Sequence, residues 1–398
     1  MSEPNVPVVD NAAELAALCE RVAREPRVAI DTEFHAERSY SARLMVVQLA
    51  FEDGVAIVDP KAVPDLSPLV AALGETTVVG HALSSDLKIF ADRYDAVPSR
   101  VFDTQVAASF LGYGMQISLA DLVYDLRDVR LAKTQTVSDW SARPLSARQI
   151  EYLVDDVAHL LPMHDILIER LRDKGRYEWA LEECAELGDV ARYRVDERRA
   201  YMKIPGAIRM NRRELGILNE LVKLRDRLAR ERDLPPKYIL ADDVVGGLAT
   251  LRPKALEDLA QLRRLEAGLR RQLGPALLEA VARGEAIPEA DLPERPRRPL
   301  GISRDTFAAL MSVVVGEIAR ENGMPAGLLA PRSALERVAR ELPQTHEELQ
   351  AALGLSAWRW ELLGTQLERL LSGGATLAIE GYADGDPKIR LSHGSTNE

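Results

Sequence analysis

The chain of 398 residues is 46% hydrophobic and too long for one ordinary core, so we expect two or three domains. Its two cysteines, Cys19 and Cys184, lack CxxC spacing, which argues against a disulfide framework or cysteine-ligated metal and favours a reducing cytoplasm. No apolar run approaches the ~20 residues that span a bilayer, and residues 1–15 lack a basic stretch followed by an apolar one, so we expect neither membrane insertion nor secretion.

The net charge of −11 argues against a uniformly basic nucleic-acid-binding surface, but the charge is unevenly distributed. Residues 1–200 carry 22 Lys and Arg against 34 Asp and Glu, residues 201–300 carry 20 against 15, and residues 301–398 carry 9 against 13. The middle of the chain is therefore a separate basic unit. The acidic first part either serves solubility or includes a cluster that holds cations.

The first part alternates between strand-like and helix-like segments. Short β-branched apolar runs predict strands, and Glu52-Asp53-Gly54 is a hairpin turn signal, so the first three strands should be antiparallel. Later segments alternate between helical and strand periodicity, which predicts an α/β domain with a mixed sheet. The expected strands cover residues 27–30, 44–51, 54–60 and 76–81, the helices cover 66–73 and 84–95, and the alternation continues through 101–112.

Two carboxylates end the first of these strands. Asp31 and Glu33 are two residues apart, so in a strand their side chains share one face, roughly 6–7 Å apart along the chain. Like charges so placed repel each other unless a cation lies between them. The same pattern also occurs on solvated edge strands, so these two residues alone leave both explanations open.

Three further residues lie on predicted helices. Asp86 follows a strand at the start of a helix, and Tyr152 and Asp156 are four residues apart, which places them on one helix face. Either piece alone is weak, because helical aspartates and such pairs are mostly surface chemistry.

In this order and context, the motifs resemble those of the DEDD superfamily of 3′→5′ exonucleases and, in detail, those of the ribonuclease D family. The resemblance covers most of residues 25–170 and implies a ribonuclease H-like mixed-sheet exonuclease domain. The matching stretches are DTEF, RSY and VQLA within 31–50, VVGHALSSDLKIF (78–90), VFDTQVAASFLG (101–112) and SDWSARPLSARQIEYLVDDVAHLLP (138–162).

The resemblance also implies a catalytic set with two divalent ions, Mg²⁺ or Mn²⁺. Four acids without His or Cys match these hard cations better than zinc. Asp31 would bridge both ions, Glu33 and Asp156 would bind the ion that activates water, and Asp86 would support the second ion through its waters. Tyr152 would orient the attacking water with its hydroxyl.

One position separates two branches of the superfamily. The branch that uses a histidine places it where this chain has Glu151, whereas the tyrosine branch places its tyrosine at the position of Tyr152. The chain therefore resembles the tyrosine branch. We interpret His81 and His159 as structural histidines, and we leave Asp155 off the metal set because it lies about 100° around the helix from its acidic neighbour.

Other residues in the matched stretches have separate interpretations. Asp103 is expected to cap the helix that follows it. Arg143 either holds a phosphate or pairs with an acid, and the sequence leaves both open. Phe34 and His35 follow the metal acids closely enough to touch a terminal nucleotide, whereas Tyr40 is expected to give core or hydrogen-bond support.

The second half of the chain is helical and contains an ungapped repeat at an offset of 90 residues. ARERDLPPKYI (229–239) aligns with ARENGMPAGLL (319–329), and Pro253 aligns with Pro343. Two copies of one helical module therefore follow each other. Each copy resembles an HRDC domain, the small helical module that ribonuclease D shares with certain helicases.

These features divide the chain into five parts. The linker contains enough proline to prevent a helix, and the polar tail is expected to be flexible. The parts are an exonuclease domain with a trailing connecting helix (1–200), a first HRDC domain (205–285), a proline-rich linker (286–301), a second HRDC domain (302–373) and a C-terminal tail (374–398).

The first HRDC copy carries a dense run of cations. They either form a solvated helix face paired with neighbouring acids or contact an RNA backbone, and both interpretations stay open. The second copy lacks the excess charge, so we expect it to serve packing or substrate enclosure. The run consists of Arg209, Arg212, Arg213, Lys223, Arg225, Arg227, Arg230 and Arg232.

Together these features predict a metal-dependent 3′→5′ exoribonuclease that releases nucleoside 5′-monophosphates one at a time. The resemblance implies structured RNA with a single-stranded 3′ end, above all tRNA precursors, as the substrate. Two alternatives stay open, a DNA exonuclease of repair and a catalytically silent RNA-binding scaffold. A scaffold should have lost one of the metal acids, and none of the four is missing.

Overall fold

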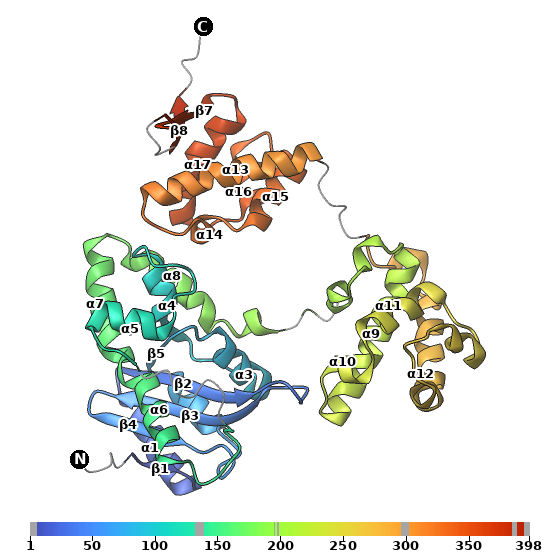
Figure 1. Cartoon of the computed structure of the whole chain (residues 1–398), viewed down its shortest axis with the longest axis horizontal. Coiled ribbons are helices and arrows are strands. Elements are labelled where there is room, and N and C mark those ends of the chain that lie inside the picture. The colour runs from blue at the N-terminus through green and yellow to red at the C-terminus, as the bar shows by residue number, and fades with distance from the viewer. Residues whose placement is uncertain are drawn as a thin grey trace.

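A computed structural model describes residues 6–131, 139–194, 196, 199–295, 302–383 and 388–393. The chain forms a sheet-containing domain followed by two helical modules (Figure 1). Among the described residues, no helix is both long enough and apolar enough to span a membrane.

A six-stranded mixed sheet forms the centre of the first domain, with the strand order β1-β4-β3-β2-β5-β6. The antiparallel pairing of β2 with β3 and of β3 with β4 confirms the three predicted antiparallel strands, while β5 and β6 continue the sheet in parallel with β2. The strands are β1 (Val8–Val9), β2 (Arg27–His35), β3 (Arg43–Phe51), β4 (Gly54–Val58), β5 (Thr77–Gly80) and β6 (Arg100–Asp103).

Helices cover both faces of this sheet, and the alternation of side chains along β2 assigns each residue to one face. Val28 and Ile30 belong to the core under α1, α2 and α3, whereas Ala29 belongs to the core under α4, α5 and α7. The helices of this domain are α1 (Ala12–Val22), α2 (Ser67–Leu73), α3 (Ser84–Tyr94), α4 (Thr104–Ser109), α5 (Leu119–Arg127), α6 (Ala147–Ala158), α7 (Leu160–Asp173) and α8 (Tyr177–Ala185).

Among the described residues, four short 3₁₀ turns lie between this domain and the first helical module (212–286), and residues 302–371 form the second helical module. The 90-residue repeat is preserved in three dimensions, because α11 and α15 begin and end at positions 90 residues apart. The turns are η1 (Glu186–Gly188), η2 (Val190–Tyr193), η3 (Ala200–Lys203) and η4 (Ala207–Arg209). The first module contains α9 (Arg212–Arg232), α10 (Pro236–Ile239), α11 (Asp242–Leu251), η5 (Leu256–Gln261) and α12 (Ala267–Ala286). The second contains α13 (Ile302–Glu321), α14 (Ala326–Leu329), α15 (Arg332–Glu341), α16 (His346–Leu353) and α17 (Ala357–Leu371).

The second module shares a continuous hydrophobic core with the first domain. Trp358 stacks on Trp179 with ring centroids 5.1 Å apart and lies 5.3 Å from the ring of Phe110. Arg359 forms an ion pair with Glu183 at 2.5 Å, and both side chains are nearly buried (14% and 13% exposed). This module is therefore docked mainly by apolar packing.

The first module meets the sheet-containing domain through polar contacts at the connection between β2 and β3 (Figure 1). The Tyr40 hydroxyl donates to Asp226 Oδ1 at 2.7 Å, and the Tyr40 backbone N–H donates to Asp233 Oδ1 at 3.1 Å. The guanidinium of Arg43 donates to Asp233 Oδ2, and that of Arg230 lies over the Tyr40 ring. Tyr40 thus gives the hydrogen-bond support expected of it, but it does so across a domain boundary.

Part of the tail that was expected to be flexible is a hairpin. Strands β7 (Ala375–Glu380) and β8 (Lys388–His393) pair antiparallel, so the expectation is wrong for these residues. Alternating apolar residues in TLAIE and KIRLS give the period of a strand, and this signal was missed. Residues 384–387 and 394–398 of the predicted tail lie outside the described residues, as do 296–301 of the predicted linker; before them the chain forms the short η6 (Glu289–Asp291).

Candidate active site

Three of the predicted metal acids converge beside the sheet. Asp31 and Glu33 lie on β2, and Asp156 lies on α6, which begins with a capping box formed by Ser146 and Gln149. Each of the three acids offers a carboxylate oxygen, and these oxygens all lie within 4.8 Å of one another. The strand therefore presents the two acids on the sheet face that α6 covers.

Asp86 reaches the same region from the opposite face. It lies in the first turn of α3, is 7% exposed, and accepts a hydrogen bond from the Thr32 hydroxyl. Because side chains alternate along β2, Thr32 points toward α3 while its two acidic neighbours point away from it. The sequence reasoning missed this role of Thr32, although its place between the two acids was a signal.

The turn before α3 fixes where Asp86 lies. Ala82 adopts a left-handed conformation (φ 57°), which is costly for a residue with a side chain. Asp103 holds this turn, because its carboxylate accepts from the N–H groups of Ala82 (3.0 Å) and Leu83 (2.8 Å). The same carboxylate caps α4 through the N–H of Gln105 at 2.8 Å, which agrees with its predicted capping role. Asp103 thus positions Asp86 as well as capping a helix.

Tyr152 lies one helical turn before Asp156. Its hydroxyl lies near the Asp156 carboxylate and opposes the rise in the pKa of that acid, and its ring centroid lies 5.8 Å from that of Trp140. Burial, followed by the charges of Asp156 and Glu33, raises the pKa of Tyr152 above its ordinary range. The phenol is therefore protonated at neutral pH and can act as a hydrogen-bond donor.

The electrostatics of the cluster favour a bound cation. Burial is the main cause that raises the pKa of Glu33 to about 8, with the charges of Asp156 and Asp86 adding to it. Burial also raises the pKa of Asp156 and that of Asp86 to about 6, although the nearby Tyr152 hydroxyl and the hydrogen bond from Thr32 oppose the respective shifts. The pKa of Asp31 is raised well above its ordinary value, by burial and by the charges of Asp86, Asp156 and Glu33. Ligands made only of oxygen, at this mutual distance, are consistent with divalent metal use.

The histidines near the site are engaged in structural contacts. His81 bonds through Nδ1 to the Thr104 hydroxyl at 2.9 Å and through Nε2 to the Ile117 carbonyl at 3.0 Å, and burial lowers its pKa. His159 ends α6 and contacts the Arg127 guanidinium. Both positions fit the structural interpretation.

The structure decides between the two interpretations of Arg143. Its guanidinium donates to both carboxylate oxygens of Asp59, at 2.6 and 2.7 Å, and to the carbonyls of Met45 and Trp140. Arg143 therefore pairs with an acid and ties the segment before α6 to β3 and the end of β4.

A groove of about 500 Å³ lies along the connection between β2 and β3. It starts with the two residues that follow Glu33 and runs along the β2–β3 connection toward Arg43. Arg38 in this groove is exposed and forms no ion pair within the described chain. The lining residues are Phe34, His35, Ala36, Glu37, Arg38, Ser39, Arg43, Met45 and Ser141.

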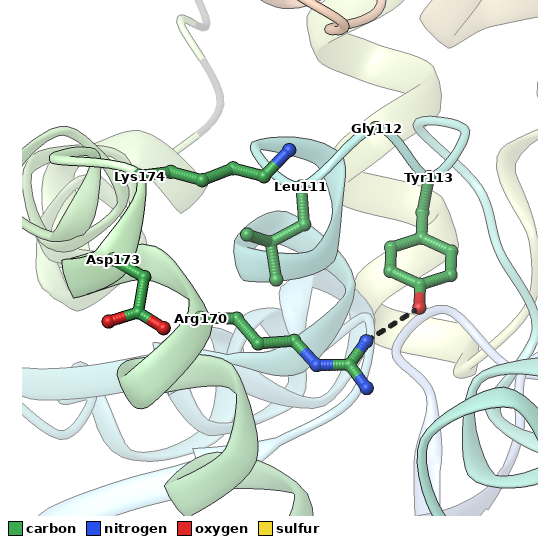
Figure 2. Close-up of a pocket in the computed structure, with 6 residues that line it drawn as sticks. All are labelled: Leu111, Gly112, Tyr113, Arg170, Asp173 and Lys174. Atoms are coloured by element: carbon green, nitrogen blue, oxygen red, sulfur yellow. Dashed lines mark hydrogen bonds between the residues drawn. The ribbon is translucent and has the colours of Figure 1, made fainter.

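A separate hollow of about 430 Å³ lies between the α4–α5 connection and the end of α7 (Figure 2). Arg170 donates to the Tyr113 hydroxyl at 3.3 Å, and Lys174 and Asp173 lie on the neighbouring turn. None of its lining residues adjoins a predicted metal acid in the chain, whereas Phe34 and His35 of the groove directly follow Glu33, so the groove is the better candidate for substrate.

Comparison with protein families gives matches in both halves of the chain. A family model described as a 3′-5′ exonuclease matches residues 6–172, and one described as an HRDC domain matches residues 214–281 and 307–371. The chain is 38% identical to ribonuclease D of Acidiphilium cryptum, over 96% of each chain, and 35% identical to that of Granulibacter bethesdensis, over 95% of each.

A solved structure is similar over the same extent. The crystal structure of Escherichia coli RNase D, described as an exoribonuclease involved in structured RNA processing, superposes with a TM-score of 0.82 and 31% identity. The match covers 93% of this chain and 99% of that one. The comparisons of sequence, of domain order and of fold therefore all relate the chain to the same group of proteins.

Proposed function

The chain belongs to the ribonuclease D family and is a 3′→5′ exoribonuclease, and from this premise we propose that Asp31, Glu33, Asp86 and Asp156 hold two divalent ions, Mg²⁺ or Mn²⁺. The observation that carries the proposal is the convergence of three carboxylates within 4.8 Å. The raised pKa values of these groups support it, because a cation is what relieves repulsion among buried acids.

Each cycle hydrolyses the last phosphodiester bond of the RNA. Two divalent ions, when bound, make a water molecule more acidic and stabilise the oxygen that leaves. Water attacks phosphorus in line, the bond from phosphorus to the 3′ oxygen of the preceding nucleotide breaks, and that oxygen takes a proton. The products are a nucleoside 5′-monophosphate and an RNA one nucleotide shorter.

The protein's own groups orient this reaction. The Tyr152 hydroxyl lies near the Asp156 carboxylate, and we assign it to positioning the attacking water. A phenol with a raised pKa suits an orienting role better than that of a general base. Phe34, His35 and Arg38 line the groove next to Glu33, where they would hold the terminal nucleotides.

We assign the substrate class as structured RNA with a single-stranded 3′ end, such as tRNA precursors. The description of the Escherichia coli enzyme as acting in structured RNA processing supports this assignment. The relatives are named as ribonucleases, which favours RNA over the DNA-repair alternative, and the presence of all four acids opposes a silent scaffold.

A cleavage assay on matched substrates tests the proposal. A 5′-labelled hairpin with a short 3′ tail, as RNA and as DNA, is incubated with Mg²⁺, Mn²⁺ or EDTA. We expect a metal-dependent ladder that shortens from the 3′ end of RNA and forms more slowly on DNA. Asp156→Asn should slow it by more than about a hundredfold, as loss of a metal ligand does.

Asp155→Asn is the matched control, since it changes the adjacent acid outside the cluster. It should cut RNA at a rate close to that of the unmodified protein. Equal loss in both variants, or cutting that persists in EDTA, would contradict the assigned metal site. Equal rates on DNA would contradict the substrate class.

A further inference from the structure

The short helix α10 of the first module exposes an aromatic ring. Tyr238 is 65% exposed, and its hydroxyl makes no hydrogen bond to any described residue. Two cations lie beside it in the chain. Arg232 ends α9, Lys237 directly precedes the tyrosine, and both are exposed without an ion pair among the described residues.

Most of the cation run predicted in this module is neutralised internally, which makes the free cations informative. Arg225 is buried against Asp242 at 2.6 Å, and Arg213 donates to carbonyl groups at the end of α12. The remaining pairs are Arg212 with Glu289, Lys223 with Glu220, Arg227 with Glu231 and Arg230 with Asp226. Six residues of the run are therefore paired inside the protein, although Arg225 among them is buried rather than solvated, whereas Arg209 and Arg232 are exposed without an ion pair among the described residues.

The exposed ring and its cations lie in the segment of the first module that contacts the groove along the β2–β3 connection. Asp233, the neighbour of Arg232, accepts hydrogen bonds from the Tyr40 N–H and from Arg43. Arg43 also lines the groove that begins after Glu33. The end of α9, followed by α10, therefore lies where the far end of the groove meets the first module (Figure 1).

The internal repeat shows that the module fold does not require these side chains. At the positions 90 residues later, Arg232 corresponds to Asn322, Lys237 to Gly327 and Tyr238 to Leu328. α14 has the same length as α10, yet Leu328 is only 3% exposed and belongs to the core that the second module shares with the exonuclease domain. The cations and the exposed ring are thus particular to the copy that meets the groove.

We propose that Arg232, Lys237 and Tyr238 form a contact surface for the single-stranded 3′ segment of the RNA. The Tyr238 ring stacks on an unpaired base, and the two cations pair with flanking phosphates. An unpaired strand fits this chemistry best, because a base inside a duplex does not present its face to a side chain. The inference rests on the proposed function, since it names a contact for the same RNA.

Binding of a tailed RNA, measured in EDTA so that no cutting occurs, tests this surface. Fluorescence anisotropy compares a hairpin bearing a 12-nucleotide 3′ tail with the same hairpin bearing a 2-nucleotide tail. Tyr238→Ala should weaken binding of the long-tailed RNA about tenfold, and Tyr238→Phe, which keeps the ring, should not. The Arg232→Gln/Lys237→Gln double variant should flatten the slope of log affinity against log salt by about 1.4, the value for two phosphate contacts on a single strand.

Two control variants and one activity assay make the result decisive. Tyr382→Ala removes another exposed tyrosine (78%), and Arg227→Gln removes an exposed but paired cation; neither should change binding. The surface is refuted if Tyr238→Ala binds like Tyr382→Ala, or if Tyr238→Phe loses as much affinity as Tyr238→Ala. Cutting of the tailed RNA in Mg²⁺ by the unmodified protein is scored separately, so a failure of the enzyme assignment is not confused with a failure of this surface.

Discussion

The two helical modules share one fold but meet the exonuclease domain in different ways. The second module contributes Trp358 to a core that continues into the exonuclease domain, and its α13–α14 turn accepts a hydrogen bond from Arg176 at the Asn322 carbonyl. The first module uses the equivalent turn, at Asp233, for exposed polar contacts with Tyr40 and Arg43. One copy of the repeat serves as a structural support, whereas the other keeps a polar surface beside the groove at the β2–β3 connection.

The comparison shows that a few side chains are enough to give two copies of one module different contacts. The helices on either side of the turn keep their positions across the repeat, and a left-handed residue closes α11 at Arg252 as it closes α15 at Leu342. The contacts change because the turn carries charged and aromatic residues in one copy and small or apolar residues in the other.

The largest effect on stability is expected when the apolar contact between the second module and the exonuclease domain is removed. Trp358→Ala should lower the free energy of unfolding of the second module by about 3–5 kcal/mol, because a buried indole leaves a cavity between two aromatic rings. Urea unfolding followed by tryptophan fluorescence measures this loss. Trp358→Phe should lose clearly less, and a loss below about 1 kcal/mol in Trp358→Ala would show that the shared core does not hold the module.

A smaller effect, on metal affinity, is expected from the hydrogen bond between Thr32 and Asp86. Thr32→Val removes the hydroxyl that bonds to Asp86 and should weaken Mn²⁺ binding about tenfold, as loss of a hydrogen bond to a metal ligand does. Calorimetric titration measures the affinity. Thr32→Ser restores the hydroxyl and should restore affinity; equal weakening in both variants would assign the loss to packing.

The raised pKa values of the acids should also make the stability of the metal-free protein depend on pH. The pKa of Glu33 is raised from its ordinary 4.5 to about 8 in the folded protein. The folded state therefore gains stability from the protonated carboxyl, and this gain is complete below about pH 4.5 and is lost as the pH rises through 8. The melting temperature in EDTA should therefore fall between pH 5.5 and 8.5, by about 2–4 °C for each kcal/mol lost. Glu33→Gln should flatten this dependence and melt higher than the unmodified protein at pH 8.5. A dependence that is unchanged in Glu33→Gln would refute the assigned cause.

The smallest effect on stability is expected at the polar contact of the first module. Asp233→Ala removes the carboxylate that accepts from the Tyr40 N–H and from Arg43. The substitution should lower the free energy of unfolding by less than about 1 kcal/mol, because the ion pair with Arg43 is exposed to solvent. The distance between dyes on the first module and on the exonuclease domain should nevertheless broaden, and raising the salt concentration should broaden it in the unmodified protein too. An unchanged distance distribution under both treatments would show that these contacts do not position the module.

The sequence predicted the sheet and the acids because their signals are local. Two-residue spacing placed Asp31 and Glu33 on one face, and four-residue spacing placed Tyr152 beside Asp156, as the structure has them. Their functional roles came from the resemblance and stay a proposal. The alternation of the two faces of β2 also explains why Asp86, held by Thr32, lies outside the cluster of the other three acids.

Features that depend on distant segments could not be predicted in this way. Arg143 pairs with Asp59, and Tyr40 with Asp226, across 84 and 186 positions of the chain, and no local pattern indicates either partner. The pairing of the cation run on α9 has the same origin, since acids on other elements neutralise part of it. The C-terminal hairpin had a local signal in its alternation, so that omission was one of interpretation.

The central claim is that the acids on β2, α3 and α6 form a site for two divalent ions. Titration with Mn²⁺, with free ion followed by electron paramagnetic resonance, tests it most directly by counting the ions bound by the unmodified protein and by Asp156→Asn. The account predicts two ions per chain in the unmodified protein and at least one fewer tightly bound ion in the variant. The same number of ions bound with the same affinity by both proteins would contradict it.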